Sequence, residues 1–155
     1  MTVLSIAECP DCGNVRPLFE ECPHCGSQNI PVLNSDTVEI NIKQGSPLVE
    51  DALGQLTDHL RKSMDLGIKA IVLIHGYGSS GEGGRIKWAV HEALESNQYA
   101  DRVEEYFFGE QVPFGSEPYR ALLKRRPGLK SYLQRFKEGN AGMTVLLLGT
   151  SHRNA

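Results

Sequence analysis

The chain has 155 residues, of which 40% are hydrophobic and 23% are charged, as in one soluble globular domain with a small appendage. It contains no uninterrupted apolar run of about 18 residues, which excludes a membrane span. Its first residues, MTVLSIAECP, lack the basic stretch of a signal peptide, so the sequence predicts a cytoplasmic protein.

The charged residues are distributed unevenly. A formal net charge of −3 argues against a general nucleic-acid binder, but residues 111–140 contain seven basic and two acidic side chains and so carry +5. Such a segment indicates either an anionic partner or a solvated helix face, and both interpretations stay open at this point.

All four cysteines lie near the N-terminus, in the stretch CPDCGNVRPLFEECPHCG. They form two Cys-x-x-Cys pairs, each followed by glycine: Cys9, Cys12, Cys22 and Cys25. Two such turns can supply the closed tetrahedral shell of four thiolates that structural Zn²⁺ prefers. Disulfides are typical of exported chains and a redox motif needs one pair only, so zinc is the favoured interpretation. His24, inside the second turn, is interpreted as a surface residue because four cysteines already fill the site.

A unit of about 30 residues buries too little surface to fold without help, so metal binding must supply its folding energy. We therefore predict a zinc ribbon over residues 1–33, with a structural or protein-docking role. Chelation of the metal is expected to unfold this unit and to leave the remainder of the chain folded.

The body of the chain alternates between strand and helix patterns. TVEINIK predicts a half-buried strand, with its hydrophobic side chains on one face and Glu39, Asn41 and Lys43 on the other. Ser46 and Pro47 then favour a helix start, and Gly67 favours its end. IKAIVLI is a continuous apolar run, typical of a strand that is covered on both faces.

After a glycine-rich loop, the spacing predicts a helix that buries one side, formed by Ile86, Val90, Ala93 and Leu94. Trp88 is expected in the core or partly covered, and His91 on the helix surface. RVEEYFF and MTVLLLG predict two further strands. The segment between them holds a basic helical stretch that is broken at Pro127. These elements predict an α/β (α+β sandwich) domain over residues 36–150, with a basic insert at about 110–141.

The glycine-rich loop, IHGYGSSGEGGRIK, connects a buried strand to a helix, which is where ligands bind in such sheets. Glycines allow a ligand to approach the backbone closely, and a helix N-terminus favours an anion, so phosphate is the predicted ligand. The loop lacks the Gly-Lys-Ser/Thr ending of a Walker loop, and its G-x-G-x-x-G match to a dinucleotide site stands alone. His75 is either an acid–base group for a phosphodiester or a histidine that only bonds the neighbouring backbone.

The stretch IHGYGSSGEGGRIKWAVHEAL resembles the His-Gly-x-Gly loop of the Smr (small MutS-related) domain. AGMTVLLL resembles the last strand of that family, and the resemblance covers roughly residues 38–110 and 142–148. It implies a two-layer βαβαβ(β) sandwich like the C-terminal domain of translation initiation factor 3. It also implies nucleic-acid binding and, in several members, endonuclease activity on DNA or RNA. His75, Gly76 and Gly78 map onto the family's loop.

The chain departs from the family at the end of the first strand. Family members carry Leu-Asp-Leu-His-Gly there, and its Asp and His are implicated in cleavage. The corresponding stretch here is INIKQGS, in which Asn41 stands for the Asp and Lys43 for the His. Asn41 cannot act as a carboxylate base, and Lys43 can hold a phosphate but is a poor acid–base group near neutral pH.

We therefore predict a protein that binds DNA or RNA, with a phosphate held at the HGYG loop and without robust nuclease activity. One alternative is an active endonuclease, a phosphodiester hydrolase that uses His75 as its candidate catalytic residue. Another is a protein-interaction module that docks through the zinc ribbon. The residues expected to bind phosphate or nucleic acid are Lys43, Gly76, Gly78, Gly81, Arg85, Lys87, Lys124, Arg125 and Arg126.

Overall fold

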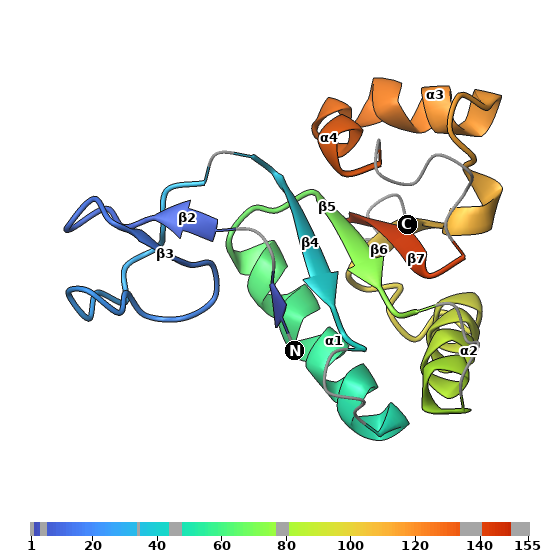
Figure 1. Cartoon of the computed structure of the whole chain (residues 1–155), viewed down its shortest axis with the longest axis horizontal. Helices are drawn as coiled ribbons and strands as arrows, with labels where there is room; N and C mark the ends of the chain where they lie inside the picture. The colour runs from blue at the N-terminus through green and yellow to red at the C-terminus, as the bar shows by residue number, and fades with distance from the viewer. Residues whose placement is uncertain are drawn as a thin grey trace.

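The computed structural model describes residues 2–3, 6–33, 35–43, 48–76, 81–133 and 141–149. These residues form two sheets and four helices in a mixed α+β fold, which confirms the predicted fold class (Figure 1). The strands are β1 (Thr2–Val3), β2 (Ile6–Glu8), β3 (Val15–Pro17), β4 (Thr37–Asn41), β5 (Ala70–Ile74), β6 (Val103–Phe108) and β7 (Met143–Leu148). The α-helices are α1 (Val49–Asp65), α2 (Gly81–Glu95), α3 (Glu117–Arg125) and α4 (Lys130–Leu133). Short 3₁₀ turns cover Gly109–Gln111 and Pro127–Leu129.

The large sheet has the strand order β1-β4-β5-β7-β6. β4 and β5 are parallel and joined by the crossover helix α1, with Thr37 beside Ala70 and Asn41 beside Ile74. β7 runs antiparallel to both β5 and β6. The C-terminal ends of β4, β5 and β6 therefore meet the start of β7 at one end of the sheet. The segment 77–80, which holds Gly78, and the predicted helix start at Ser46 and Pro47 lie outside the described residues.

Helices α1 and α2 cover one face of this sheet. Their apolar stripes pack on the inward side chains of β4, β5 and β7 in a single cluster, which includes the four α2 residues expected there: Ile86, Val90, Ala93 and Leu94. α1 ends as expected at Gly67, whose φ of +80° is a left-handed conformation that glycine adopts without strain.

The basic insert covers the opposite face of the sheet (Figure 1). α3 begins at Ser116, whose hydroxyl accepts a hydrogen bond from the backbone N–H of Tyr119 at 3.3 Å. The apolar side chains of the insert pack on the second face of β5 and β7, and they are Val112, Tyr119, Leu122, Leu129 and Leu133. The insert thus adds a third layer to the predicted two-layer sandwich.

Strand β4 is buried on both faces, including Glu39, rather than half-buried as expected. Tyr132 of the insert donates a hydrogen bond to the carbonyl of Thr37 in this strand at 3.1 Å.

The N-terminal unit is tied to the body of the chain. β2 and β3 form a separate antiparallel hairpin, but β1 pairs with the edge of β4 in the large sheet. Ala7 and Leu18 are buried in the same cluster as α1, and the ring of Phe19 lies 4.9 Å from that of His59. The proposed boundary at residue 33 stays a prediction, and these contacts cross it.

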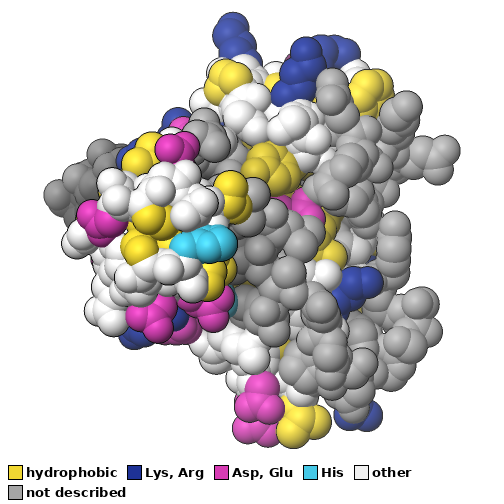
Figure 2. Space-filling model, turned by 60° about the vertical axis from the view of Figure 1, so that its left-hand side comes forward, with side chains coloured by type: hydrophobic (Ala, Val, Ile, Leu, Met, Phe, Trp, Pro, Cys, Tyr) yellow, Lys and Arg dark blue, Asp and Glu magenta, His cyan; other side chains and the backbone are white. Residues whose placement is uncertain are grey.

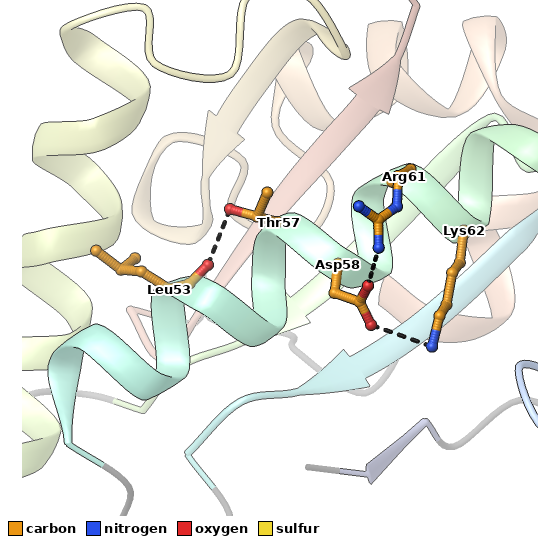
Figure 3. Close-up of polar contacts among 5 residues, drawn as sticks. All are labelled: Leu53, Thr57, Asp58, Arg61 and Lys62. Carbon is orange, nitrogen blue, oxygen red and sulfur yellow. Dashed lines mark hydrogen bonds and ion pairs between the residues drawn. The ribbon is translucent and has the colours of Figure 1, made fainter.

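The outer face of α1 is polar and carries ion pairs between residues of neighbouring turns (Figure 3). Asp58 pairs with Arg61 one turn away and with Lys62 at 3.1 Å, and the hydrogen bond from Lys62 lowers the pKa of Asp58. Such exposed pairs contribute little to stability, so the apolar face of α1 is what holds this helix on the sheet. Among the described helices, none combines the length and apolar character needed to cross a bilayer.

Candidate nucleic-acid interface and metal site

His75 follows β5 directly and is completely buried. Its Nδ1 lies 2.9 Å from the carbonyl oxygen of Gly76, and its Nε2 lies 2.8 Å from the hydroxyl of Thr144 in β7. A carbonyl can only accept, so Nδ1 carries the hydrogen and Nε2 accepts from the threonine hydroxyl. Both nitrogens of the ring are therefore engaged within the protein.

Burial lowers the pKa of His75 to about 4, and the nearby groups His91 and Lys87 act in the same direction. The imidazole is consequently neutral at physiological pH. The backbone at this position is also fixed, because the carbonyl of Gly142 accepts hydrogen bonds from the N–H groups of His75 and Gly76, both at 3.0 Å. The arrangement makes His75 the anchor of the strand end from which the glycine loop departs.

Gly76 opens the loop with a φ of +91°, which L side chains rarely adopt. A Cβ at this position would lie 3.2 Å from Cδ of Lys43, so the lysine side chain packs beside the backbone of Gly76. Lys43 comes from the end of the neighbouring strand β4 and is exposed. Two residues of the predicted phosphate set, Lys43 and Gly76, are thus brought together by the parallel pairing of β4 and β5.

Asn41 is the last residue of β4. Its Oδ1 accepts a hydrogen bond from the backbone N–H of Lys43 at 2.9 Å. The amide therefore shapes the turn after β4 and sets the direction in which Lys43 leaves the strand.

The first turns of α2 hold the other loop-side candidates. Gly81 begins the helix, and Arg85 is exposed one turn further on. Lys87 differs, because only 8% of its side chain is exposed and its Nζ lies 3.6 Å from Oε2 of Glu110. The surface at this end of the sheet therefore offers the cations of Lys43 and Arg85, whereas the charge of Lys87 is already opposed by Glu110.

The basic residues of the insert lie elsewhere. Arg125 forms a 2.6 Å ion pair with Glu105, which is beside Leu147 near the far end of the sheet. The following turn at Gly128 lies against Thr37 at the start of β4. In Figure 2 basic side chains gather at the upper edge of the molecule, where Figure 1 places α3 and α4. The structure separates Lys124, Arg125 and Arg126 from the glycine loop by at least the length of β5, about 13 Å.

One expectation on α2 is wrong, because His91, expected on the surface, is only 6% exposed. Trp88, expected in the core or partly covered, is 64% exposed. The reason is the ring of Phe108 on β6, which stacks on His91 with centroids 3.7 Å apart and an interplanar angle of 12°. That contact takes the histidine into the helix–sheet interface, while the indole faces away from the core.

Thr144 was not singled out from the sequence, although its hydroxyl donates to Nε2 of His75. The available signal was a single hydroxyl in the otherwise apolar run MTVLLL. A buried hydroxyl in a core strand needs a partner, but sequence alone does not show which residue provides it.

The four cysteines form one compact cluster. All four sulfur atoms lie within 4.8 Å of one another, and both the Cys9–Cys25 and the Cys12–Cys22 pair are 3.6 Å apart. This separation is too long for a disulfide, and it fits the sulfur–sulfur spacing of a tetrahedral site with Zn–S bonds of about 2.3 Å.

The turns that carry the cysteines repeat each other. Gly13 and Gly26 have φ values of +77° and +76°, and each donates its N–H to the carbonyl of the first cysteine of its pair. Only glycine takes this conformation readily, which explains the glycine after each pair. His24 is exposed, as expected.

The ionisation of the cluster also suits a cation. Burial raises the pKa of Cys9, but backbone N–H groups of Cys12 and Asp11 outweigh it and lower that pKa to about 6. For Cys25 a backbone N–H of Ser27 lowers the pKa, but burial and the three other thiols raise it to about 12. Four thiolates at this spacing need a cation to ionise together, so the four cysteines could bind a metal ion.

Comparisons with known proteins gave a match to a family model and a match to a solved structure. The family model described as "Smr domain" matches residues 48–112. Among solved structures, the chain is similar to the crystal structure of the Smr domain of Thermus thermophilus MutS2. The identity is 23%, the TM-score is 0.41, and the match covers 73% of this chain and 96% of that chain. The comparison with curated proteins gives no match.

The matched range includes α1, β5, the glycine loop, α2 and β6, and so contains both His75 and the exposed Arg85. Smr domains are associated with nucleic-acid binding and nuclease-like function. Residues 48–112 of this chain are therefore similar to the Smr domain.

Proposed function

We propose that the chain binds DNA or RNA by holding a backbone phosphate at the glycine loop, and that it does so without robust cleavage. The observation that carries this proposal is the buried His75, whose two ring nitrogens are occupied by Gly76 and Thr144. That geometry supports a histidine that positions the loop rather than one that transfers protons.

Phosphate binding is supported by three neighbouring features. The backbone of Gly76 has a positive φ and no side chain covers it, and the side chain of Lys43 lies beside it. Helix α2 begins at Gly81, with Arg85 in its second turn. A helix N-terminus with adjacent cations favours an anion. Exchange of either exposed cation for glutamate is expected to weaken binding to any sequence, because phosphate contacts carry no base information.

The absence of robust cleavage is supported by the residues at the end of β4. Asn41 has no carboxylate, and its side-chain oxygen is bonded to the backbone of Lys43. His75 is neutral, because burial lowers its pKa to about 4, and its basic nitrogen already accepts from Thr144. A general acid or base needs an available proton site within reach of the substrate.

The test compares binding and cleavage on the same labelled oligonucleotides. Wild type, Lys43→Glu and Arg85→Glu are measured by fluorescence anisotropy. Lys69→Glu is the control, because this exposed lysine precedes β5 at the end of the sheet opposite the loop. We expect each of the loop variants to weaken binding about tenfold, to lower the salt slope by about one, and to leave the control unaffected. Equal affinities for all four proteins would overturn the phosphate site.

The endonuclease alternative is tested in parallel with gel-purified protein. Cleavage by wild type that persists after removal of contaminating nuclease, and that disappears in His75→Gln, would favour an enzyme in which the His75 ring takes part. No cleavage by any variant supports binding alone.

We further propose that the cysteine cluster holds a structural Zn²⁺ and forms a zinc ribbon. The 3.6 Å sulfur pairs and the repeated glycine turns support this assignment. The protein-docking alternative also has support, because three hydrophobic residues of this unit, Val15, Ile30 and Val32, are between 49% and 69% exposed. A chain that binds no nucleic acid at low salt would favour that alternative.

A further inference from the structure

Trp88 presents a large aromatic surface to solvent at the loop end of the molecule. It is 64% exposed and lies in the middle of α2, seven residues after Gly81. Seven residues are about two helical turns, so both residues lie on the same side of the helix, about 10 Å apart. Arg85 is three residues before Trp88 and is its neighbour on the helix surface.

The indole is held in place from beneath. Its ring meets the edge of His91 with centroids 5.5 Å apart, and His91 in turn stacks on Phe108. The ammonium of Lys87 lies 5.4 Å from the indole centroid and is fixed by Glu110. An exposed ring with a fixed orientation loses little conformational entropy when a flat ligand stacks on it.

A shallow hollow of about 400 Å³ adjoins the indole and is lined by Trp88, His91, Glu92, Glu95 and Ser96. All five residues lie on α2 or directly after it, and two of them, Glu92 and Glu95, carry carboxylates. Nε2 of His91 has no hydrogen-bond partner within the described part of the chain, although the residue is only 6% exposed. A buried ring nitrogen without a partner is a polar position that a ligand can satisfy.

These features select one kind of ligand. Two carboxylates repel phosphate, so the hollow does not suit the backbone of a nucleic acid. They accept hydrogen bonds from amino groups, as carboxylates do from the N4 amino group of cytosine. The indole of Trp88 offers a stacking surface, and the nearby carboxylates accept hydrogen bonds. Together they fit an unpaired nucleobase that carries an exocyclic amino group.

We propose that Trp88 stacks on an unpaired base of the strand whose phosphate lies at the glycine loop, with Glu92 and Glu95 accepting from its amino group. This inference rests on the proposed function and deepens it by naming single-stranded nucleic acid as the substrate class. It follows that cytosine is preferred over uracil, since the two bases differ in the amino group at position 4. Arg85 lies between the loop and the indole and neutralises the intervening phosphate.

The experiment uses the full chain, loaded with zinc, and short oligo(dC), oligo(dU) and duplex DNA. Trp88 is the single tryptophan of the chain, so intrinsic fluorescence reports contact at this residue directly. Anisotropy of a labelled oligonucleotide reports binding independently. The variants are Trp88→Leu, Trp88→Phe and, as an aromatic control, Phe114→Leu. Phe114 is 47% exposed in the wild type and packs beside Tyr119 of the insert, which covers the opposite face of the sheet.

We expect single strands to quench the tryptophan and duplex DNA to leave it unchanged. Trp88→Leu is expected to weaken single-strand binding about tenfold, Trp88→Phe to recover most of that loss, and Phe114→Leu to bind as wild type. Replacement of both Glu92 and Glu95 by leucine is expected to remove the preference for oligo(dC) without lowering affinity for oligo(dU).

The outcomes separate the two proposals. Salt-dependent binding that leaves the fluorescence unchanged, together with normal affinity of Trp88→Leu, overturns the stacking inference and leaves the phosphate site standing. Equal losses for single strands and duplex in Trp88→Leu overturn the preference for unpaired bases. A complete lack of anisotropy change at low salt removes the proposed function and this inference with it.

Discussion

Nε2 of His75 lies 2.8 Å from the hydroxyl of Thr144, and this hydrogen bond joins the end of β5 to β7. The same strand end is held by Gly142, whose carbonyl accepts from the backbone of His75 and Gly76. The glycine loop therefore starts from residues that hydrogen bonds hold in place. A binding loop on a rigid base is what phosphate recognition by backbone groups requires.

Thr144→Val tests this anchor, because it keeps the shape of the side chain and removes the hydroxyl. We expect a loss of about 1–3 kcal/mol in the free energy of unfolding, since Nε2 of His75 is left buried without a donor. Urea denaturation of Thr144→Val, His75→Ala and the double variant gives the coupling between the two residues. Strictly additive losses would show that the two side chains do not depend on each other.

The stability of the fold is expected to fall in mild acid. The pKa of His75 is lowered to about 4 from an ordinary value near 6.5, so the unfolded chain binds more protons between these two pH values. The neutral His75 therefore contributes fully to the free energy of unfolding above pH 6.5. This contribution, roughly 3 kcal/mol, is lost as the pH falls toward 4. Burial also lowers the pKa values of His91 and His59, and both act in the same direction.

His75→Gln provides the comparison for the pH effect. It removes the titrating group, so its stability is expected to change less than that of wild type between pH 7 and pH 4, as measured by urea denaturation at each pH. Parallel curves for the two proteins would show that His75 is not the source of the acid sensitivity.

Gly76→Ala is expected to destabilise the protein, whereas Gly54→Ala is expected to stabilise it. Gly76 has a φ of +91° and leaves only 3.2 Å between a new Cβ and Lys43, so alanine costs about 1–2 kcal/mol there. Gly54 lies inside α1 with open space around it, where alanine gains up to about 1 kcal/mol. Thermal unfolding compares the two, and a stabilised Gly76→Ala would contradict the described backbone.

Cys12→Ser separates a metal site from four ordinary thiols. Cys12 is exposed, so replacing a thiol by a hydroxyl is nearly neutral unless the sulfur is a ligand. We expect loss of bound zinc by elemental analysis and loss of amide protection over residues 6–33, with Glu21→Ser as the control. Because β1 pairs with β4 and Leu18 is buried beside α1, we also expect the body to lose stability without unfolding. Full zinc content in Cys12→Ser would contradict the site.

Lys124→Glu combined with Arg125→Glu tests the role of the insert. The sequence analysis counts both residues among those expected to bind phosphate or nucleic acid. The ion pair of Arg125 with Glu105 places that residue toward the far end of the sheet, about the 13 Å length of β5 from the glycine loop. We therefore expect little change for an oligonucleotide too short to span that distance and a clear loss for a longer one. Anisotropy with a series of lengths measures this, and a loss independent of length would place the main contact on the insert.

The elements of the body were predictable because their patterns are local. The apolar runs of β5 and β7 and the buried stripe of α2 follow directly from sequence spacing. The sequence left open whether the insert covers the sheet or extends a nucleic-acid footprint, since a basic amphipathic helix looks the same in both cases. The buried Glu39 follows from the layer that the insert adds.

The candidate site was likewise predictable only where its residues are close together in the sequence. The glycine loop and the cysteine pairs carry their chemistry in consecutive residues, which a sequence displays. The bond between His75 and Thr144 joins residues that are 69 positions apart, and the stacking of His91 on Phe108 depends on how α2 rests on β6. His91 was therefore assigned to the wrong surface, because only this packing decides whether His91 or Trp88 faces the sheet.

The most direct test of the account is the affinity of the wild-type chain for a single-stranded oligonucleotide as a function of salt concentration. We predict binding at low salt whose logarithmic affinity falls linearly with the logarithm of the salt concentration, with a shallower slope for Lys43→Glu. An affinity that is independent of salt, or no binding at the lowest salt concentration, would contradict a phosphate site at the glycine loop.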